Sequence, residues 1–121
     1  MSKMKVLVVD DSPTDLKLMI QPFLNQGYEL VTATDGEEAL KKAESEQPDL
    51  MVLDVIMPKI NGFKVCRQIK GSAKLKNIKI ILLTSRNQES DKFWGEKQGA
   101  DAYITKPFTG EDLLSTAAGL L

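Results

Sequence analysis

The chain has 121 residues, of which 42% are hydrophobic and 27% charged, so one compact domain with its own core is expected. A net charge of −1 gives no basic surplus for nucleic acid or an anionic membrane, and no stretch approaches the roughly 20 apolar residues of a membrane span. The single cysteine, Cys66, excludes an internal disulfide framework, and the chain opens without a signal-peptide core, which favours a cytoplasmic protein.

The first strand and helix are predicted within the opening 27 residues. Val6–Val9 is an unbroken apolar run, typical of a strand buried on both faces, and it ends on two acids. Ser12 can cap a helix, with Asp15 at the capping-box spacing, and apolar residues then repeat at helical intervals. Pro22 lies inside that pattern and should kink or strain the helix, which we expect to stop at Gly27.

Another strand, helix and strand follow. Leu30–Ala33 is a short predicted strand, and Glu37–Glu46 is a predicted helix that Pro48 ends. Leu50–Leu53 is a second continuous apolar run, again typical of a doubly buried strand. It ends on Asp54, so an ionisable side chain is carried to the carboxyl end of a central strand, where ligands bind in open α/β sheets.

The rest of the chain repeats the alternation. A helix follows Gly62, and Ile78–Leu83 is a third buried strand. Ser90–Gln98 has the composition of a helix, although it contains a glycine. Ala102–Thr105 is a short last strand, and Thr109 caps an amphipathic final helix.

Five strands alternating with five helices predict a parallel sheet with right-handed crossovers, which is an α/β fold built as a three-layer sandwich. No linker, repeat or low-complexity tract interrupts the chain. We therefore expect residues 1–121 to form a single domain.

Polar side chains end four of the predicted strands: Asp10-Asp11, Asp54, Thr84 and Lys106. Parallel strands point their carboxyl ends the same way, so these groups can meet in one cleft. Three carboxylates repel one another, and a hard cation such as Mg²⁺, which prefers oxygen ligands, would relieve the repulsion. Lys106 and Thr84 could then cradle a phosphoryl group carried on a carboxylate. Each feature alone has a structural explanation as a strand end, helix cap or turn, but their combination favours a site.

With these residues in place, the sequence resembles the receiver domains of two-component response regulators over essentially its whole length. The resemblance rests on the four strand ends above together with Met57-Pro58, Gly62 and Lys106-Pro107. It implies a flavodoxin-like, doubly wound fold with five parallel strands in the order 2-1-3-4-5. The peptide bond before the residue that matches Pro107 is often cis in this family.

The resemblance also implies the chemistry. Asp54 would accept a phosphoryl group from a phosphohistidine on a partner histidine kinase, which fits a chain that has no histidine of its own. Asp10, Asp11, Asp54 and the backbone carbonyl of Ile56 would arrange Mg²⁺. The protein would then be a phosphoacceptor switch and not an enzyme acting on other substrates.

Switch and tuning positions are implied in the same way. Thr84 and Lys106 would contact the phosphoryl oxygens, and Tyr103 would change rotamer in concert with Thr84. Ile56 and Arg86 lie two residues after Asp54 and Thr84, at positions that tune hydrolysis of the acyl phosphate. A branched aliphatic side chain at Ile56 cannot orient water, which favours a longer-lived phosphoryl group.

The chain stops after the final helix, so the resemblance points to a stand-alone receiver of the chemotaxis or pilus-motility type. Its downstream protein target would bind the face made by the fourth helix, fifth strand and fifth helix. No nucleic-acid or membrane partner is expected.

Three alternatives remain. A metal-dependent phosphatase could also use Asp54 as nucleophile, but Ile56 stands where a second acid is usual and no cap is inserted. A flavodoxin-like cofactor binder would need a phosphate-cradling loop after the first strand, where Asp10 and Asp11 would instead repel phosphate. A degenerate receiver that binds partners without phosphorylation is the third, and the complete acidic set with Lys106 argues against it.

Overall fold

The computed structural model describes residues 3–85, 93–94 and 97–121. Within them, no helix is long and apolar enough to cross a membrane. The elements are β1 Lys5–Val9, α1 Pro13–Ile20, the 3-10 helix η1 Gln21–Phe23, β2 Glu29–Ala33, α2 Gly36–Glu46, β3 Leu50–Leu53, α3 Gly62–Lys70, β4 Lys79–Thr84, β5 Ala102–Thr105 and α5 Gly110–Leu120.

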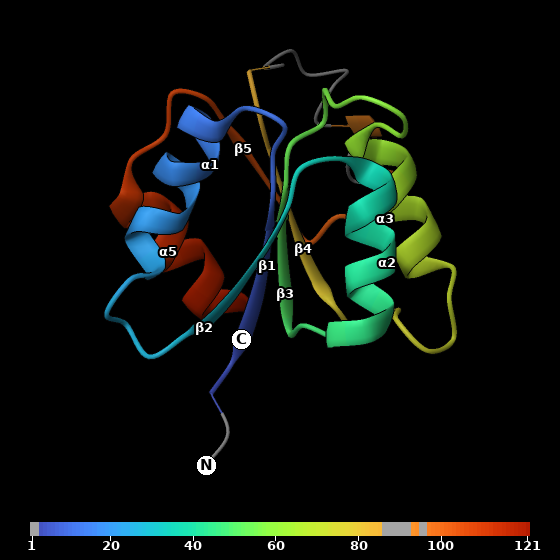
Figure 1. The fold of residues 1–121 in the computed structure, drawn as a ribbon, viewed down its shortest axis with the longest axis horizontal. Coiled ribbons are helices and arrows are strands. Elements are labelled where there is room, and N and C mark those ends of the chain that lie inside the picture. Colours follow the sequence, from blue (N-terminus) through green and yellow to red (C-terminus); the bar gives the residue numbers. More distant parts are fainter. Residues whose placement is uncertain (1–2, 86–92, 95–96) are drawn as a thin grey trace.

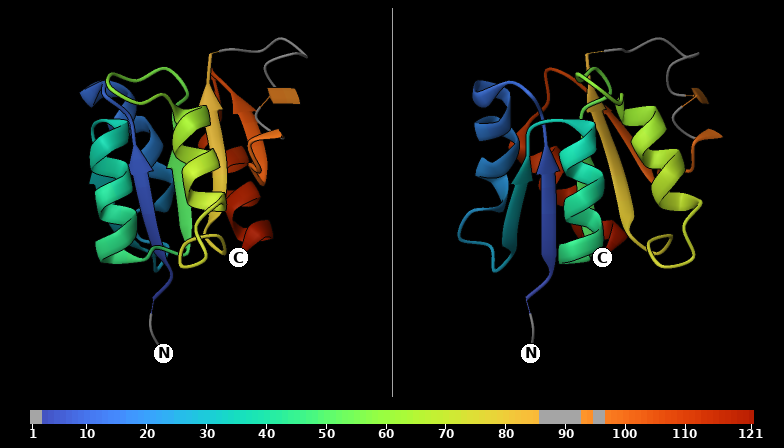
Figure 2. Two further views of the ribbon diagram at one scale, coloured as in Figure 1. Left: turned by 90° about the vertical axis from the view of Figure 1, so that its right-hand side faces the viewer. Right: turned by 45° about the vertical axis from the view of Figure 1, so that its right-hand side comes forward.

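The five strands form one parallel sheet in the order β2-β1-β3-β4-β5, which confirms the predicted fold class and strand order. Helices α1 and α5 cover one face of the sheet, and α2 and α3 cover the other (Figure 1). Because all strands point the same way, their carboxyl ends lie along one edge (Figure 2). Every polar strand end singled out in the sequence is therefore carried to that edge.

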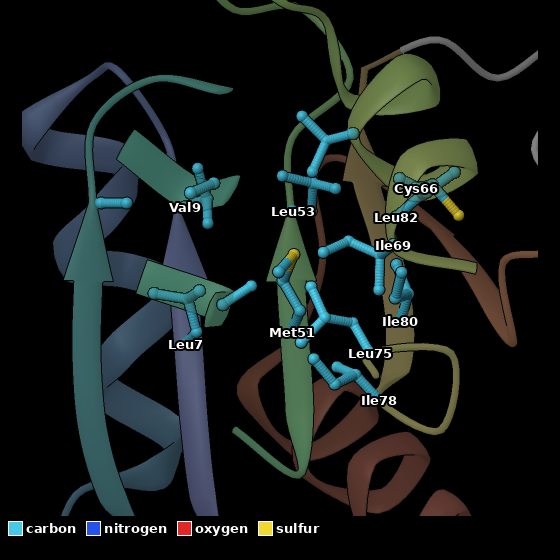
Figure 3. Close-up of a cluster of buried hydrophobic side chains, with 14 of the residues drawn as sticks. Leu7, Val9, Met51, Leu53, Cys66, Ile69, Leu75, Ile78, Ile80 and Leu82 are labelled. Atoms are coloured by element: carbon cyan, nitrogen blue, oxygen red, sulfur yellow. The ribbon is translucent and has the colours of Figure 1, made fainter. Parts of the chain in front are cut away.

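Alternation along the central strands divides the core into two layers, since successive side chains point to opposite faces. The layer under α2 and α3 takes Leu7, Val9, Met51, Leu53, Ile80 and Leu82, together with Cys66 and Ile69 of α3 (Figure 3). The layer under α1 and α5 takes Val6, Val8, Leu50, Val52, Ile81 and Leu83. Burial on both faces explains why these strands read as unbroken apolar runs.

Helix capping follows the sequence at both helices that carry a capping box. The Ser12 hydroxyl accepts a hydrogen bond from the backbone N–H of Asp15 at 3.3 Å. The Thr109 hydroxyl accepts one from the backbone N–H of Asp112 at 3.0 Å. Asp15 and Asp112 therefore hold equivalent places in the first turns of α1 and α5.

The first helix differs from the prediction. It ends at Ile20, and residues Gln21–Phe23 form a 3-10 turn, whereas the sequence pattern suggested a kinked helix reaching towards Gly27. Pro22 has no N–H to donate and its ring would clash with the carbonyl four residues earlier, so the α-helix stops before it. Gly27 lies in the following turn at φ +85°, a conformation that glycine adopts readily.

The helix predicted for Ser90–Gln98 lies largely outside the described residues, so the count of five helices stays a prediction. Its predicted end is described: Gly99 has φ +93°, and the N–H of Gln98 donates to the carbonyl of Trp94 at 3.1 Å. The Trp94 side chain is exposed.

Gly62 begins α3 directly against the loop that follows β3. Its N–H donates to the carbonyl of Val55 at 2.8 Å, and a Cβ built on it would lie 2.2 Å from the carbonyl oxygen of Asp54. The clash is with backbone, which cannot rotate away as a side chain can. Close approach of α3 to the strand end that carries Asp54 therefore requires glycine.

We expect Gly62→Ala to lower the free energy of unfolding by about 1–3 kcal/mol, because the added methyl group overpacks a rigid contact. Urea denaturation measures this. Gly119→Ala is the matched control: no atom lies within 4 Å of the Cβ it would add, and Gly119 lies in α5. That control should be neutral or gain up to about 1 kcal/mol from helix propensity. Equal stability of the parent and Gly62→Ala would contradict the steric argument.

Candidate functional site

Backbone hydrogen bonds place the candidate residues at the carboxyl edge of the sheet. The N–H of Asp54 donates to the carbonyl of Val9 at 3.1 Å, and that of Lys106 donates to the carbonyl of Thr84 at 2.7 Å. The parallel pairing thus continues one residue past the end of β3, against β1, and one residue past the end of β5, against β4. The polar residues at the four strand ends, which the sequence predicts to meet, are therefore all attached to one sheet.

Three carboxylates gather there, as expected. Asp10, Asp11 and Asp54 each offer an oxygen within 4.8 Å of the others' oxygens. Asp10 and Asp54 are only 1% and 7% exposed, while Asp11 is exposed at the mouth. An oxygen-only donor set of this charge, open to solvent on one side, fits a hard divalent cation that keeps several waters. The residues present therefore fit Mg²⁺.

Lys106, the residue directly after β5, faces the acids. Its Nζ lies 3.1 Å from Oδ2 of Asp10, 3.1 Å from Oδ2 of Asp15 and 3.6 Å from Oδ2 of Asp54. The sequence predicts only a capping role for Asp15, so its contact with Lys106 is seen in the structure alone. The signal that could have found it is its place in the first turn of the helix that begins at this edge.

The second oxygens of the buried acids accept backbone N–H groups. Oδ1 of Asp10 accepts the N–H of Ser12 at 2.9 Å, and Oδ1 of Asp54 accepts that of Ile56 at 3.4 Å. Each acid thus presents one oxygen to its own loop and the other to Lys106. The carboxylates are held in place before any ligand arrives.

Burial and charge act in opposite directions on the site. Burial raises the pKa of Asp54 above its ordinary value; Lys106 lowers it, and the neighbouring Asp10 raises it further. Burial lowers the pKa of Lys106, but its hydrogen bonds to Asp10 and Asp15 and the negative charges of Asp54 and Asp10 together outweigh this, so the pKa is raised overall. The ammonium form of Lys106 is therefore favoured, whereas burial disfavours the charged form of the Asp54 beside it.

The predicted switch residues lie on adjacent strands. Thr84 is buried at the end of β4, in register with Thr105 of β5. Tyr103 is partly buried and packs against the core layer under α2 and α3. Strand alternation puts Tyr103 on the same face as Thr105, so Thr84 and Tyr103 lie on one face of neighbouring strands. Their coupled movement stays a prediction.

The predicted tuning residues are only partly described. The Ile56 side chain is 57% exposed at the mouth of the acidic cluster. Arg86 lies outside the described residues.

The Lys106–Pro107 peptide bond is cis, as the resemblance implied.

Comparisons with known proteins agree on one family. The family model for the response regulator receiver domain matches residues 6–118. Protein PilH of Pseudomonas aeruginosa is 38% identical over 117 residues, which cover 97% of both chains. The alkaline phosphatase synthesis transcriptional regulatory protein PhoP of Bacillus subtilis is 44% identical over 97% of this chain but only 48% of its own length. The chain thus spans about half the length of PhoP and nearly all of PilH.

Solved structures give the same result. The chemotaxis response regulator CheY4 of Vibrio cholerae superposes with a TM-score of 0.91 at 35% identity, over 98% of this chain and 99% of that one. The likeness thus includes both the sheet and the helices that cover it.

The raised pKa of Asp54 predicts how stability depends on pH. An acid whose pKa is raised by folding favours the folded state at low pH, and this contribution is lost as the pH rises from the ordinary value of 3.8 through the raised one. Asparagine does not titrate. With divalent cations removed by EDTA, Asp54→Asn should therefore be more stable than the parent at pH 7, and the difference should shrink as the pH falls towards 4.

Urea denaturation of the parent and Asp54→Asn at several pH values measures that difference. A variant that is less stable than the parent at pH 7, or a difference that does not change with pH, would contradict the argument.

Proposed function

Because the chain belongs to the response regulator receiver family and functions in phosphorelay signal transduction, we propose that Asp54 accepts the phosphoryl group from a histidine kinase. The observation that carries the proposal is the position of Asp54. It is 7% exposed at the end of a central strand, grouped with two other acids and 3.6 Å from the ammonium of Lys106. A carboxylate so placed is both fixed in position and flanked by positive charge.

The proposed step is a phosphoryl transfer. An oxygen of the Asp54 carboxylate bonds to phosphorus while the bond from phosphorus to the donor's imidazole nitrogen breaks, giving an acyl phosphate and a free imidazole on the kinase. Lys106 stabilises the charge on the phosphoryl oxygens. Asp10, Asp11, Asp54 and the backbone carbonyl of Ile56 would hold Mg²⁺, which supplies further positive charge to those oxygens.

The output proposed is a change of surface and not turnover of a separate substrate. Phosphorylation adds a charge of roughly −1.5 to −2 and three acceptor oxygens. The Thr84 hydroxyl would move towards those oxygens, and the Tyr103 ring would fill the space it leaves. The surface altered would be that of the 90–98 segment, β5 and α5, where the downstream protein target binds.

Two features favour the switch over the phosphatase alternative. Ile56 holds the position two residues after the nucleophile and offers no acid or base. Similarity to PilH and to a chemotaxis protein supports a role in motility or taxis. We further propose that residues 1–121 act as a single receiver domain in the cytoplasm, where ATP-dependent kinases work, without a nucleic-acid or membrane partner.

The direct test is phosphorylation by a small phosphodonor, such as acetyl phosphate, followed by intact mass. The parent protein with Mg²⁺ should gain one phosphoryl group, and Asp54→Asn should gain none, because an amide is not a nucleophile. EDTA should abolish the reaction, and Asp11→Asn should slow it by weakening the metal site.

Asp112→Asn serves as the control, since it removes an acid from the first turn of α5 and should label like the parent. Full labelling of Asp54→Asn would refute the assignment of the acceptor. Undiminished labelling in EDTA would refute the metal requirement.

The exposed Ile56 side chain generates a second prediction. It lies at the mouth of the cluster and provides no hydrogen bond to orient an attacking water. Ile56→Asn should therefore lose the phosphoryl group several-fold faster, measured by the decay of phosphorylated protein in intact mass. A decay rate equal to or slower than that of the parent would contradict the role of Ile56. Leu18→Asn, a similar change on the exposed side of α1, should leave the decay unchanged.

A further inference from the structure

We propose that Asp15 is a positioning residue that holds Lys106 in the resting protein and competes for its ammonium with a phosphoryl group on Asp54. The inference rests on the function proposed above. Asp15 would then compete with the phosphoryl group for the ammonium and would slow phosphorylation of the site.

The resting contacts occupy two of the three N–H donors of Lys106 with hydrogen bonds. An ammonium has three N–H donors and accepts nothing. Its Nζ has three carboxylate oxygens around it: hydrogen bonds of 3.1 Å to Asp10 and 3.1 Å to Asp15, and an ion pair of 3.6 Å to Asp54. The third N–H faces Asp54 and can reach a phosphoryl oxygen there, but Lys106 can give that group a second hydrogen bond only when Asp10 or Asp15 gives one up.

Exposure decides which partner is released. The side chain of Asp10 is 1% exposed and that of Asp54 is 10% exposed, whereas that of Asp15 is 41% exposed. Losing Lys106 would leave the buried carboxylates short of both water and a counter-charge, which is costly. Asp15 can exchange the ammonium for water at little cost. The Asp15–Lys106 pair is thus the weakest of the three.

The surroundings allow this release. Asp15 and Lys106 line one groove of about 660 Å³ between α1 and the segment that follows β5, so the freed carboxylate has open space beside it. The backbone of Asp15 stays fixed, since its N–H is held by the Ser12 cap at 3.3 Å. Only the side chain needs to turn. Its negative charge would also repel the phosphoryl group, which adds to the competition.

The test measures the affinity of beryllofluoride with Mg²⁺, a mimic of the acyl phosphate, by isothermal titration calorimetry. Asp15→Asn removes the competing charge and should bind the mimic about 2- to 5-fold more tightly, the range set by an exposed ion pair. It should also be phosphorylated faster by acetyl phosphate. Asp15→Glu keeps the charge and should remain close to the parent.

Asp112→Asn is the matched control, because it removes the same charge from the same capping position of α5. It should leave the affinity unchanged. Raising the salt concentration should shrink the difference between Asp15→Asn and the parent, since salt screens an exposed pair. A purely structural effect of the substitution would show no such salt dependence.

The outcomes separate the two proposals. A parent that does not bind beryllofluoride, or an Asp54→Asn variant that binds it equally well, overturns the proposed function itself. If the parent binds through Asp54 but Asp15→Asn binds no more tightly, the role of Asp15 is wrong. A gain equal to that of Asp112→Asn, or one that does not change with salt, also overturns it.

Discussion

The structure depends on one electrostatic constraint: carboxylates that repel one another are packed at the edge of a parallel sheet around the ammonium of Lys106. Asp10 and Asp54 are almost fully buried there, and the Lys106 Nζ lies within 3.6 Å of both. Two buried anions side by side are costly without a counter-charge. The cluster is stable because its residues follow paired strands of the sheet and because Lys106, directly after β5, places a positive charge beside them.

The fold supplies that rigidity in two ways. Backbone pairing past the ends of β3 and β5 fixes Asp54 and Lys106 relative to their neighbours, with N–H to carbonyl distances of 3.1 Å and 2.7 Å. Gly62 lets α3 approach the carbonyl of Asp54 more closely than any side chain would permit. The acids therefore cannot relax apart, and the repulsion between them persists in the folded protein. Such a cluster of carboxylates attracts cations even before any phosphoryl group is present.

Much of this could be predicted from the sequence, because the strands are buried on both faces. Leu50–Leu53 and Ala102–Thr105 are strands with the predicted bounds, and the polar residues after them meet at one edge as parallel pairing requires. The end of α1 at Ile20 was missed, since apolar spacing continues past Pro22 and only the backbone shows the 3-10 turn. Asp15 was missed as a partner of Lys106 because 91 residues separate them and either capping or pairing could explain it.

Folding and ligand binding are coupled through the same charges. The raised pKa of Asp54 means that folding disfavours the charged form of this acid relative to the unfolded chain. A cation that binds the folded cluster and not the unfolded chain would remove that cost and stabilise the fold by mass action. A phosphoryl group does the reverse, since it adds negative charge where carboxylates already crowd. It is accommodated only if positive groups and donors move towards it, and Lys106 is the nearest positive group that the described residues offer. The electrostatic cost of the resting cluster thus makes the structure responsive to charge at Asp54.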